Sequence, residues 1–323
     1  MTKKQLLIFS FVYVLLFGVL GDFSLLSVAM NRVRRSRARV GVVGCGLMGS
    51  GIAEVAAKAG FPVVVREVND ELLQKGRSRI EASLSRAVEK GKAAPQDKVA
   101  ALGRITGTTQ LSDLSDCDLV IEAVIENMEE KKKLFRELDG RAKPSALFAS
   151  NTSSLPIIDM AAATKRGANF VGLHFFNPVP VMKLVEVVKT VVTSEEAFQM
   201  AKTFAEKLGK TVVVAKDTPG FVVNLLFVPY LLDAVRALER GVASREDIDN
   251  GMKLGCGHPM GPLELLDFVG VDTTYYIAEI MFDEFKDDHY AAPPLMRRLV
   301  AAGFWGKKTG RGIYEYDEKG NKK

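Results

Sequence analysis

The sequence predicts a doubly wound α/β sheet followed by an all-helical C-terminal domain. Short apolar strand segments alternate with amphipathic helical segments from residue 38 to residue 216. The first of these strands runs into a glycine-rich turn, and strand patterns give way to helical periodicity after residue 217. We therefore expect an N-terminal extension over residues 1–37, a sheet domain over 38–216 and a helical domain over 217–323.

The glycine-rich turn is the most informative local motif. The strand Val40–Val43 leads into it, and a helix is expected from its end to about residue 59. The first glycine permits the tight turn, the second lets the backbone approach a pyrophosphate, and the third lets the helix pack close to the strand. The helix N-terminus then presents its N–H groups to phosphate charge. This is the dinucleotide-binding turn of a Rossmann-type fold, and its expected cofactor-binding residues are Gly44, Gly46, Leu47, Met48 and Gly49.

An acidic residue stands where such a fold binds the adenosine ribose. A second apolar strand over residues 63–65 ends in Arg66 and Glu67, and Glu67 lies 18 residues past Gly49. A carboxylate there accepts from the ribose 2′-hydroxyl and repels a 2′-phosphate, which favours NAD over NADP. The neighbouring Arg66 favours NADP instead, because arginine can pair with a 2′-phosphate. NAD is the predicted cofactor.

The remaining pattern completes the sheet. Further helices are expected over 69–91, 127–142 and 194–208, and further strands over 118–122, 146–149, 169–173, 184–188 and 211–214. Strands and helices that alternate in this way form a doubly wound, mostly parallel sheet.

A histidine and a glutamate on two of these strands form the candidate catalytic pair. His174 falls at the C-terminal edge of the sheet, where open α/β sheets bind ligands, and Glu186 follows twelve residues later among apolar neighbours. A buried acid needs a partner, and on adjacent strands Glu186 would accept from one imidazole nitrogen of His174. Histidine titrates near neutral pH, which suits it to exchanging a proton with an alcohol as hydride leaves the carbon. The alternatives are a structural histidine at a strand end and a surface acid on an edge strand.

The loop over residues 150–154 is rich in hydroxyls and directly follows a strand. It can cap the helix that begins near Pro156, face the bound cofactor and substrate, or do both with different serines.

The C-terminal segment is helical throughout. Helices are expected over 221–240, from the N-cap Ser244 to about 254, and from Pro262 to about 281. Their apolar residues exceed one core face, so we expect a homo-oligomer. The basic loop over 306–312 is expected to be a solvated turn or a lid.

Composition narrows the class of protein. The net charge is +5, but residues 1–39 hold seven basic residues against one acid, so the rest of the chain is close to neutral. Nucleic acid is therefore not an expected partner. The three cysteines are widely separated, which predicts neither a disulfide framework nor a metal site.

The N-terminal extension admits several interpretations. Residues 6–20 form an apolar run shorter than a bilayer core requires, so any membrane association would come through this segment alone. It resembles a secretory signal, or an anchor for a cytoplasmic body. Translation from Met30 would instead give an arginine-rich, acid-free leader, which predicts a mitochondrial location.

Beyond the turn, the sequence resembles the L-3-hydroxyacyl-CoA dehydrogenase family, in particular its stand-alone, short-chain members that act in fatty-acid β-oxidation. The resemblance covers about residues 38–316. The motifs that carry it are residues 44–49, 150–154 (SNTSS), 174–178 (HFFNP), 183–186 (KLVE) and 217–224 (DTPGFVVN).

The resemblance implies roles for individual residues. His174 would be the catalytic base with Glu186 as its partner, while Ser153 and Asn224 would hold the 3-oxygen and thioester region of the substrate. It implies an acyl-CoA substrate and a homodimer joined through the helical domains. Contacts to the nicotinamide half of NAD would come from Glu126, Lys131, Ser153, Asn177 and Lys308, and contacts to CoA from Ser83, Lys90 and Ser153.

The sequence departs from the family pattern in the helical domain, at Leu225, Cys256 and His258. These departures leave the acyl-chain length open. His258 is a rival base, but no strand acid lies close to it in sequence, so we interpret it as a loop histidine. The same fold also serves a dehydrogenase of a sugar acid or a catalytically silent NAD-binding protein.

Overall fold

The computed structural model describes residue 28, residues 30–34 and residues 36–323. The apolar segment over 6–20 lies outside these residues. The chain divides into two compact units, one containing Pro156–Asp217 with the described residues up to Thr152, the other containing Ser153–Leu155 and Thr218–Lys323. Within the described part of the chain, no helix combines the length and the apolar character needed to cross a membrane.

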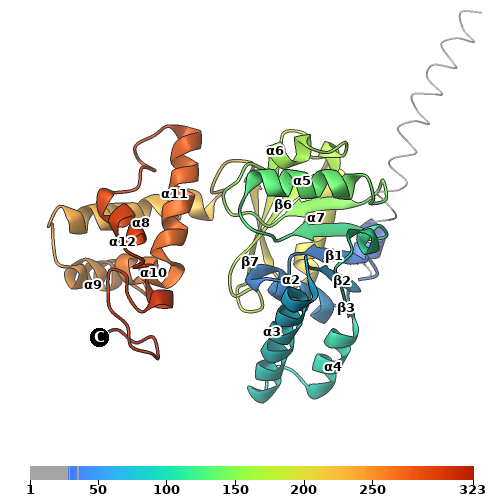
Figure 1. Cartoon of the computed structure of the whole chain (residues 1–323), viewed down its shortest axis with the longest axis horizontal. Coiled ribbons are helices and arrows are strands. Elements are labelled where there is room, and N and C mark those ends of the chain that lie inside the picture. The colour runs from blue at the N-terminus through green and yellow to red at the C-terminus, as the bar shows by residue number, and fades with distance from the viewer. Residues whose placement is uncertain (1–27, 29, 35) are drawn as a thin grey trace, which may run out of the picture. The chain divides into compact units, whose positions relative to one another are not determined.

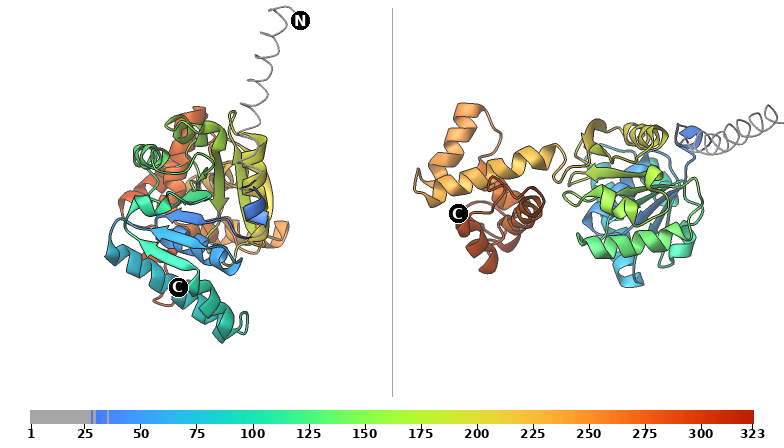
Figure 2. Two further views of the ribbon diagram at one scale, coloured as in Figure 1. Left: turned by 90° about the vertical axis from the view of Figure 1, so that its right-hand side faces the viewer. Right: turned by 90° about the horizontal axis from the view of Figure 1, so that it is seen from above.

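The first unit is built on an eight-stranded sheet of order β3-β2-β1-β4-β5-β6-β7-β8. Figure 1 labels β1, β2, β3, β6 and β7 among these strands. Its twist is visible in the left panel of Figure 2. Neighbouring strands run parallel except β6 and β7, which pair antiparallel. This confirms the predicted doubly wound, mostly parallel sheet. The strands are β1 (Val40–Val43), β2 (Val63–Arg66), β3 (Ile105–Thr108), β4 (Leu119–Glu122), β5 (Leu147–Ser150), β6 (Phe170–Phe175), β7 (Leu184–Lys189) and β8 (Thr211–Lys216).

Helices cover both faces of this sheet, so its central strands are apolar throughout rather than alternating. On one face α2, α3 and α7 bury their apolar residues against the strands, and α4 packs on α2 and α3. On the other face α5 and α6 pack together. The ring of Phe135 in α5 is tilted against Phe148 of β5 and stands in an edge-to-face contact with Phe170 of β6. The helices are α2 (Leu47–Lys58), α3 (Asp70–Glu89), α4 (Pro95–Gly103), α5 (Met128–Asp139), α6 (Ile157–Ala162) and α7 (Glu195–Lys207).

Three features of the first unit differ from the sequence-based expectation. Helix α4 and strand β3 were not predicted; β3 has one buried apolar residue, Ile105, because it is an edge strand. Residues 30–34 are helical and Val33 is fully buried in the core, so this part of the extension predicted over 1–37 packs as part of the fold. Asp118 fastens it by accepting from the Arg39 amide at 2.8 Å and from Arg32 at 3.3 Å.

The second unit is all-helical, as predicted, and α8 is its central helix, in contact with α9, α10, α11 and α12. Ser244 caps α9 through the Asp247 amide, as expected. The single helix expected from Pro262 to about 281 is wrong: α10 ends before Gly270, whose φ of 112° breaks the helix, and α11 follows. The helices are α8 (Val223–Glu239), α9 (Arg245–Cys256), α10 (Pro262–Val269), α11 (Val271–Phe285) and α12 (Pro294–Ala301).

The basic loop over residues 306–312 is anchored by a buried carboxylate. Asp267 accepts from the amides of Ile313 and Tyr314, both at 2.8 Å, and from the Tyr316 hydroxyl at 3.0 Å. A Cβ at Gly306 or Gly312 would overlap Asp267. The loop is therefore a turn packed at its base on α10.

Candidate active site

The structure brings His174 and Glu186 together. They are direct partners in the antiparallel register of β6 and β7, and imidazole Nδ1 lies 2.6 Å from the carboxylate Oε2. Both side chains are buried, His174 at 6% exposure and Glu186 at 0%. At such a site a 2.6 Å contact is a strong hydrogen bond, which fixes the orientation of the ring. The next residue, Phe175, donates its amide to the Asn151 side chain at 2.9 Å, so Asn151 is fastened beside His174.

The glycine turn has the geometry that a dinucleotide requires. Gly44 has φ +94°, and a Cβ on Gly49 would overlap the Gly44 carbonyl, so both positions need glycine. A Cβ on Gly46, in contrast, would meet nothing within 4 Å, which leaves room for a ligand to approach the backbone. Gly46 is also the N-cap of α2 and provides no side-chain cap, and the first turn of α2 contains no acid. The amides there suit an anion such as a pyrophosphate.

Glu67 lies against this turn. Its carboxylate accepts from the Cys45 amide at 2.6 Å and from the Val68 amide at 2.9 Å, and the residue is 9% exposed. Arg66 directs its Nε to the Thr109 carbonyl at 3.4 Å. The acid is thus fixed at the end of β2 beside the glycine turn, while the neighbouring arginine is bound to the loop after β3.

A buried charged cluster at the ends of β4 and β5 was not anticipated. Glu122 is fully buried and accepts from Ser150 Oγ at 2.6 Å, from the Val124 amide at 2.7 Å and from Lys131 Nζ at 2.6 Å. Lys131, 1% exposed, also lies 3.1 Å from Glu126. Glu126 in turn accepts from the Thr152 hydroxyl. The signal was present in the sequence: Glu122 ends an otherwise apolar buried strand, which makes an acid costly unless it is paired.

The first unit also contains two residues predicted to contact CoA, Ser83 and Lys90, and one predicted to contact the cofactor, Asn177. The Ser83 side chain hydrogen bonds to Glu54, which partly offsets the burial that raises the pKa of Glu54. Lys90 is the exposed C-cap residue of α3. Asn177 is exposed in the turn after β6.

Four further residues belong to the second unit. Asn224 Nδ2 donates to the Ser153 carbonyl at 3.2 Å. Lys308 Nζ lies 2.7 Å from Asp272, so the predicted cofactor contact carries its own carboxylate partner. His258 pairs through Nδ1 with the Tyr230 hydroxyl at 3.0 Å, which agrees with its interpretation as a structural histidine.

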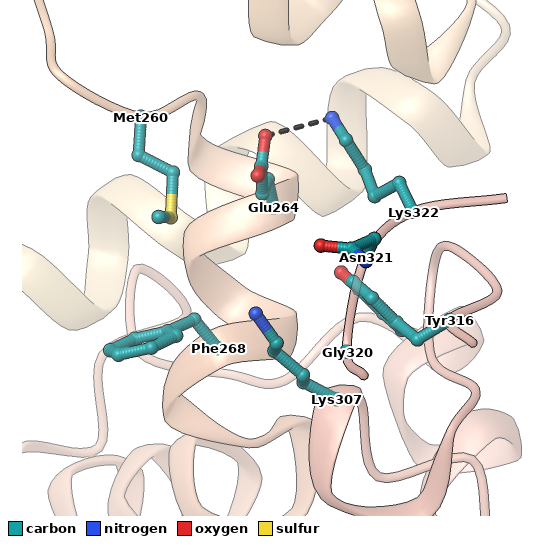
Figure 3. A pocket seen from close by; sticks show the side chains of 8 residues that line it. All are labelled: Met260, Glu264, Phe268, Lys307, Tyr316, Gly320, Asn321 and Lys322. Atoms are coloured by element: carbon teal, nitrogen blue, oxygen red, sulfur yellow. Dashed lines mark hydrogen bonds and ion pairs between the residues drawn. The ribbon is translucent and has the colours of Figure 1, made fainter. Parts of the chain in front are cut away.

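A cavity in the second unit lies between α10 and the C-terminal segment (Figure 3). An ion pair of 2.8 Å joins Glu264 and Lys322 in its wall, and Lys307 also lines it. Its volume of about 220 Å³ is below the several hundred Å³ usual for cofactor sites. None of the predicted catalytic, cofactor or CoA residues lines it.

Comparison with known proteins agrees with this geometry. Residues 39–218 match the family model described as "3-hydroxyacyl-CoA dehydrogenase, NAD binding domain", and residues 220–316 match "3-hydroxyacyl-CoA dehydrogenase, C-terminal domain".

Individual relatives align over nearly their whole lengths. The chain is 55% identical to a 3-hydroxybutyryl-CoA dehydrogenase of Mycobacterium tuberculosis, covering 86% of this chain and 98% of the relative. It is 49% identical to the human mitochondrial hydroxyacyl-coenzyme A dehydrogenase, covering 86% and 90%. The crystal structure of (S)-3-hydroxybutyryl-CoA dehydrogenase from Ralstonia eutropha superposes with a TM-score of 0.84 at 45% identity, covering 87% and 99%. The glycine turn, the fixed acid directly after β2 and the His174–Glu186 pair therefore stand in a chain that belongs to the 3-hydroxyacyl-CoA dehydrogenase family.

Proposed function

We propose that this chain catalyses the NAD-dependent oxidation of (S)-3-hydroxyacyl-CoA to 3-oxoacyl-CoA in fatty-acid β-oxidation. The observation that carries the proposal is the 2.6 Å contact between His174 Nδ1 and Glu186 at the carboxyl end of β6. Ligands of open α/β sheets bind at this edge, which also holds the glycine turn.

The pair suits hydroxyl oxidation. Because Nδ1 bonds to Glu186, exchange of the substrate hydroxyl proton falls to Nε2 of His174. As the O–H bond breaks, its electrons form the new carbonyl, and the C3–H electron pair leaves as hydride. Bound NAD supplies the hydride acceptor. The imidazolium that results is stabilised by the Glu186 carboxylate, which is buried and therefore weakly screened. In the reverse direction the same imidazolium returns the proton.

The remaining residues divide between the two ligands. We propose that the glycine turn holds the pyrophosphate, with Leu47 and Met48 in the first turn of α2, and that Glu67 binds the adenosine ribose. Ser153 and Asn224 would bind the acyl end of the substrate and Ser83 and Lys90 its CoA moiety. The nicotinamide half would be contacted by Glu126, Lys131, Ser153, Asn177 and Lys308.

Assembly and location extend the proposal. The helical unit exposes large apolar residues, which supports a homodimer formed through this unit. Among them are Leu226 at 70%, Leu254 at 86% and Phe268 at 60% exposure. A mitochondrial location would follow if translation begins at Met30. Gel filtration tests the first proposal and N-terminal sequencing of the native protein tests the second.

The test of function is reduction of acetoacetyl-CoA by NADH, followed through the absorbance of the reduced cofactor. His174→Gln should lower kcat at least about a hundredfold, the usual contribution of a general base, without changing the Kd of NADH. His289→Gln, the same change at an exposed loop histidine, should have no effect. Wild-type turnover by His174→Gln would overturn the assignment. Activity on a sugar acid in place of the thioester would support the alternative substrate class, and NADPH in place of NADH tests Glu67.

A further inference from the structure

The buried cluster formed by Glu122, Lys131 and Glu126 lies on the nicotinamide side of the sheet. In a doubly wound sheet the dinucleotide spans the point where strand order reverses, here between β1 and β4. Glu67 directly follows β2 and, as the proposed ribose-binding acid, marks the adenosine half. The nicotinamide half therefore extends over the carboxyl ends of β4, β5 and β6, and Glu122 is the last residue of β4.

In the contacts described above, two carboxylates share one ammonium. With all three groups ionised the cluster carries one net negative charge. Glu122 and Lys131 are withdrawn from water, at 0% and 1% side-chain exposure, whereas Glu126 is 35% exposed and forms the end of the cluster that reaches the surface. Interactions of a charge held in this way are screened much less than those of a free surface acid.

Donors from several elements fix the position of this charge. Glu122 accepts hydrogen bonds from Ser150 of β5, from Lys131 of α5 and from the backbone amide after β4. Glu126 accepts a hydrogen bond from Thr152 and forms an ion pair with Lys131. Lys131 thus bridges both acids. Its buried ammonium lies within ion-pair distance of both carboxylates, so besides any contact of its own with the cofactor it holds Glu126 in place.

We propose that the negative charge of this cluster strengthens binding of the oxidised cofactor relative to the reduced one, with Glu122 and Lys131 as positioning residues and Glu126 as the charge nearest the ring. The inference rests on the proposed function. The nicotinamide ring is positively charged in NAD⁺ and neutral in NADH, so a fixed negative charge lowers the free energy of the NAD⁺ complex alone. Binding of the pyrophosphate and adenosine is common to both forms and cancels in the ratio of their dissociation constants.

The experiment measures that ratio. Glu126→Gln keeps the size of the side chain and an oxygen acceptor for Thr152 and Lys131 but removes the charge. We expect Kd(NAD⁺)/Kd(NADH) to rise on the order of fivefold, mainly through weaker binding of NAD⁺. NADH is titrated by its fluorescence and NAD⁺ by competition. Glu130→Gln removes an equal charge from an exposed position in the first turn of α5 and should leave the ratio unchanged.

A second variant guards against a local rearrangement. Glu122→Gln removes the buried charge and should move the ratio in the same direction, with Kd(NADH) used to confirm that the site is intact. An unchanged ratio in Glu126→Gln, or equal weakening of both cofactors in the two variants, would overturn the inference while leaving the dehydrogenase assignment standing. Failure of the wild-type protein to bind NADH would instead remove the proposed function and the inference with it.

Discussion

Replacing Glu186 by glutamine tests how far the proposed catalytic base, His174, depends on its partner. The variant keeps the shape of the side chain but removes the charge 2.6 Å from His174 Nδ1. A hydrogen bond to a charged group contributes about 1.5–3 kcal/mol, and burial of both partners places this one at the upper end. The interaction is strongest when the imidazole carries the substrate proton, so most of its loss falls on the transition state. At about 1.4 kcal/mol per factor of ten, kcat should fall roughly a hundredfold.

The assay separates catalysis from folding and binding. kcat and KM are measured with acetoacetyl-CoA and NADH, and the Kd of NADH is expected to stay within about twofold of wild type, because Glu186 does not belong to the glycine turn. Glu195→Gln is the matched control, since this exposed acid at the start of α7 pairs with Lys189 at 2.7 Å outside the site. The control should turn over at the wild-type rate.

A double variant makes the test specific for the pair. If Glu186 acts through His174, the double variant with glutamine at both positions should be hardly slower than His174→Gln alone. Rate losses that multiply in the double variant would show two independent roles. That result, or a wild-type kcat in Glu186→Gln, would refute the reasoning.

Two further predictions concern the glycine turn and the thiols. Gly46→Leu should leave the Tm of the cofactor-free protein nearly unchanged, because a Cβ at this position meets no atom within 4 Å. The same variant should weaken NADH binding at least about tenfold, because the leucine side chain fills the space through which the pyrophosphate approaches the backbone. Gly49→Ala should instead lower the Tm by several degrees, since its Cβ overlaps the Gly44 carbonyl. Burial raises the pKa of Cys45 to about 11 and that of Cys117 to about 12. Iodoacetamide near neutral pH should therefore alkylate the exposed Cys256 first, and peptide mass mapping that finds Cys45 labelled as fast would contradict this.

The sequence was a good guide to the central strands and to the long helices. Strands buried on both faces are continuously apolar, and helices such as α3 and α5 have a clear polar and apolar side with Asn69 and Asn127 as caps. It failed for β3, an edge strand whose residues are mostly not buried, and at Gly270, where apolar helical periodicity continues across a backbone break. A hydrophobic pattern indicates which residues are buried, but it does not reveal where one glycine adopts a positive φ and ends a helix.

In the candidate site, too, some contacts could be predicted from the sequence and others could not. His174 and Glu186 could be paired because each lies on a recognisable strand and the strands are close in sequence. The cluster around Glu122 could not, since Lys131 lies on a helix and Ser150 lies on a strand whose register with β4 does not follow from the sequence. Only the assembled sheet, with Glu122 in register with Ser150, brings these donors to one carboxylate.

The antiparallel step between β6 and β7 explains how a short segment builds the proposed catalytic pair. In a parallel βαβ unit two neighbouring strands are separated by a crossover of a dozen or more residues. Here β7 returns directly, so Glu186, the third residue of β7, is in register with His174, the fifth residue of β6. The histidine thus lies near the carboxyl end of β6, while its carboxylate partner comes from the start of β7, which pairs with β8 on its other side. Burial of Glu186 then follows from topology, and a carboxylate kept out of water is the more effective partner for an imidazolium.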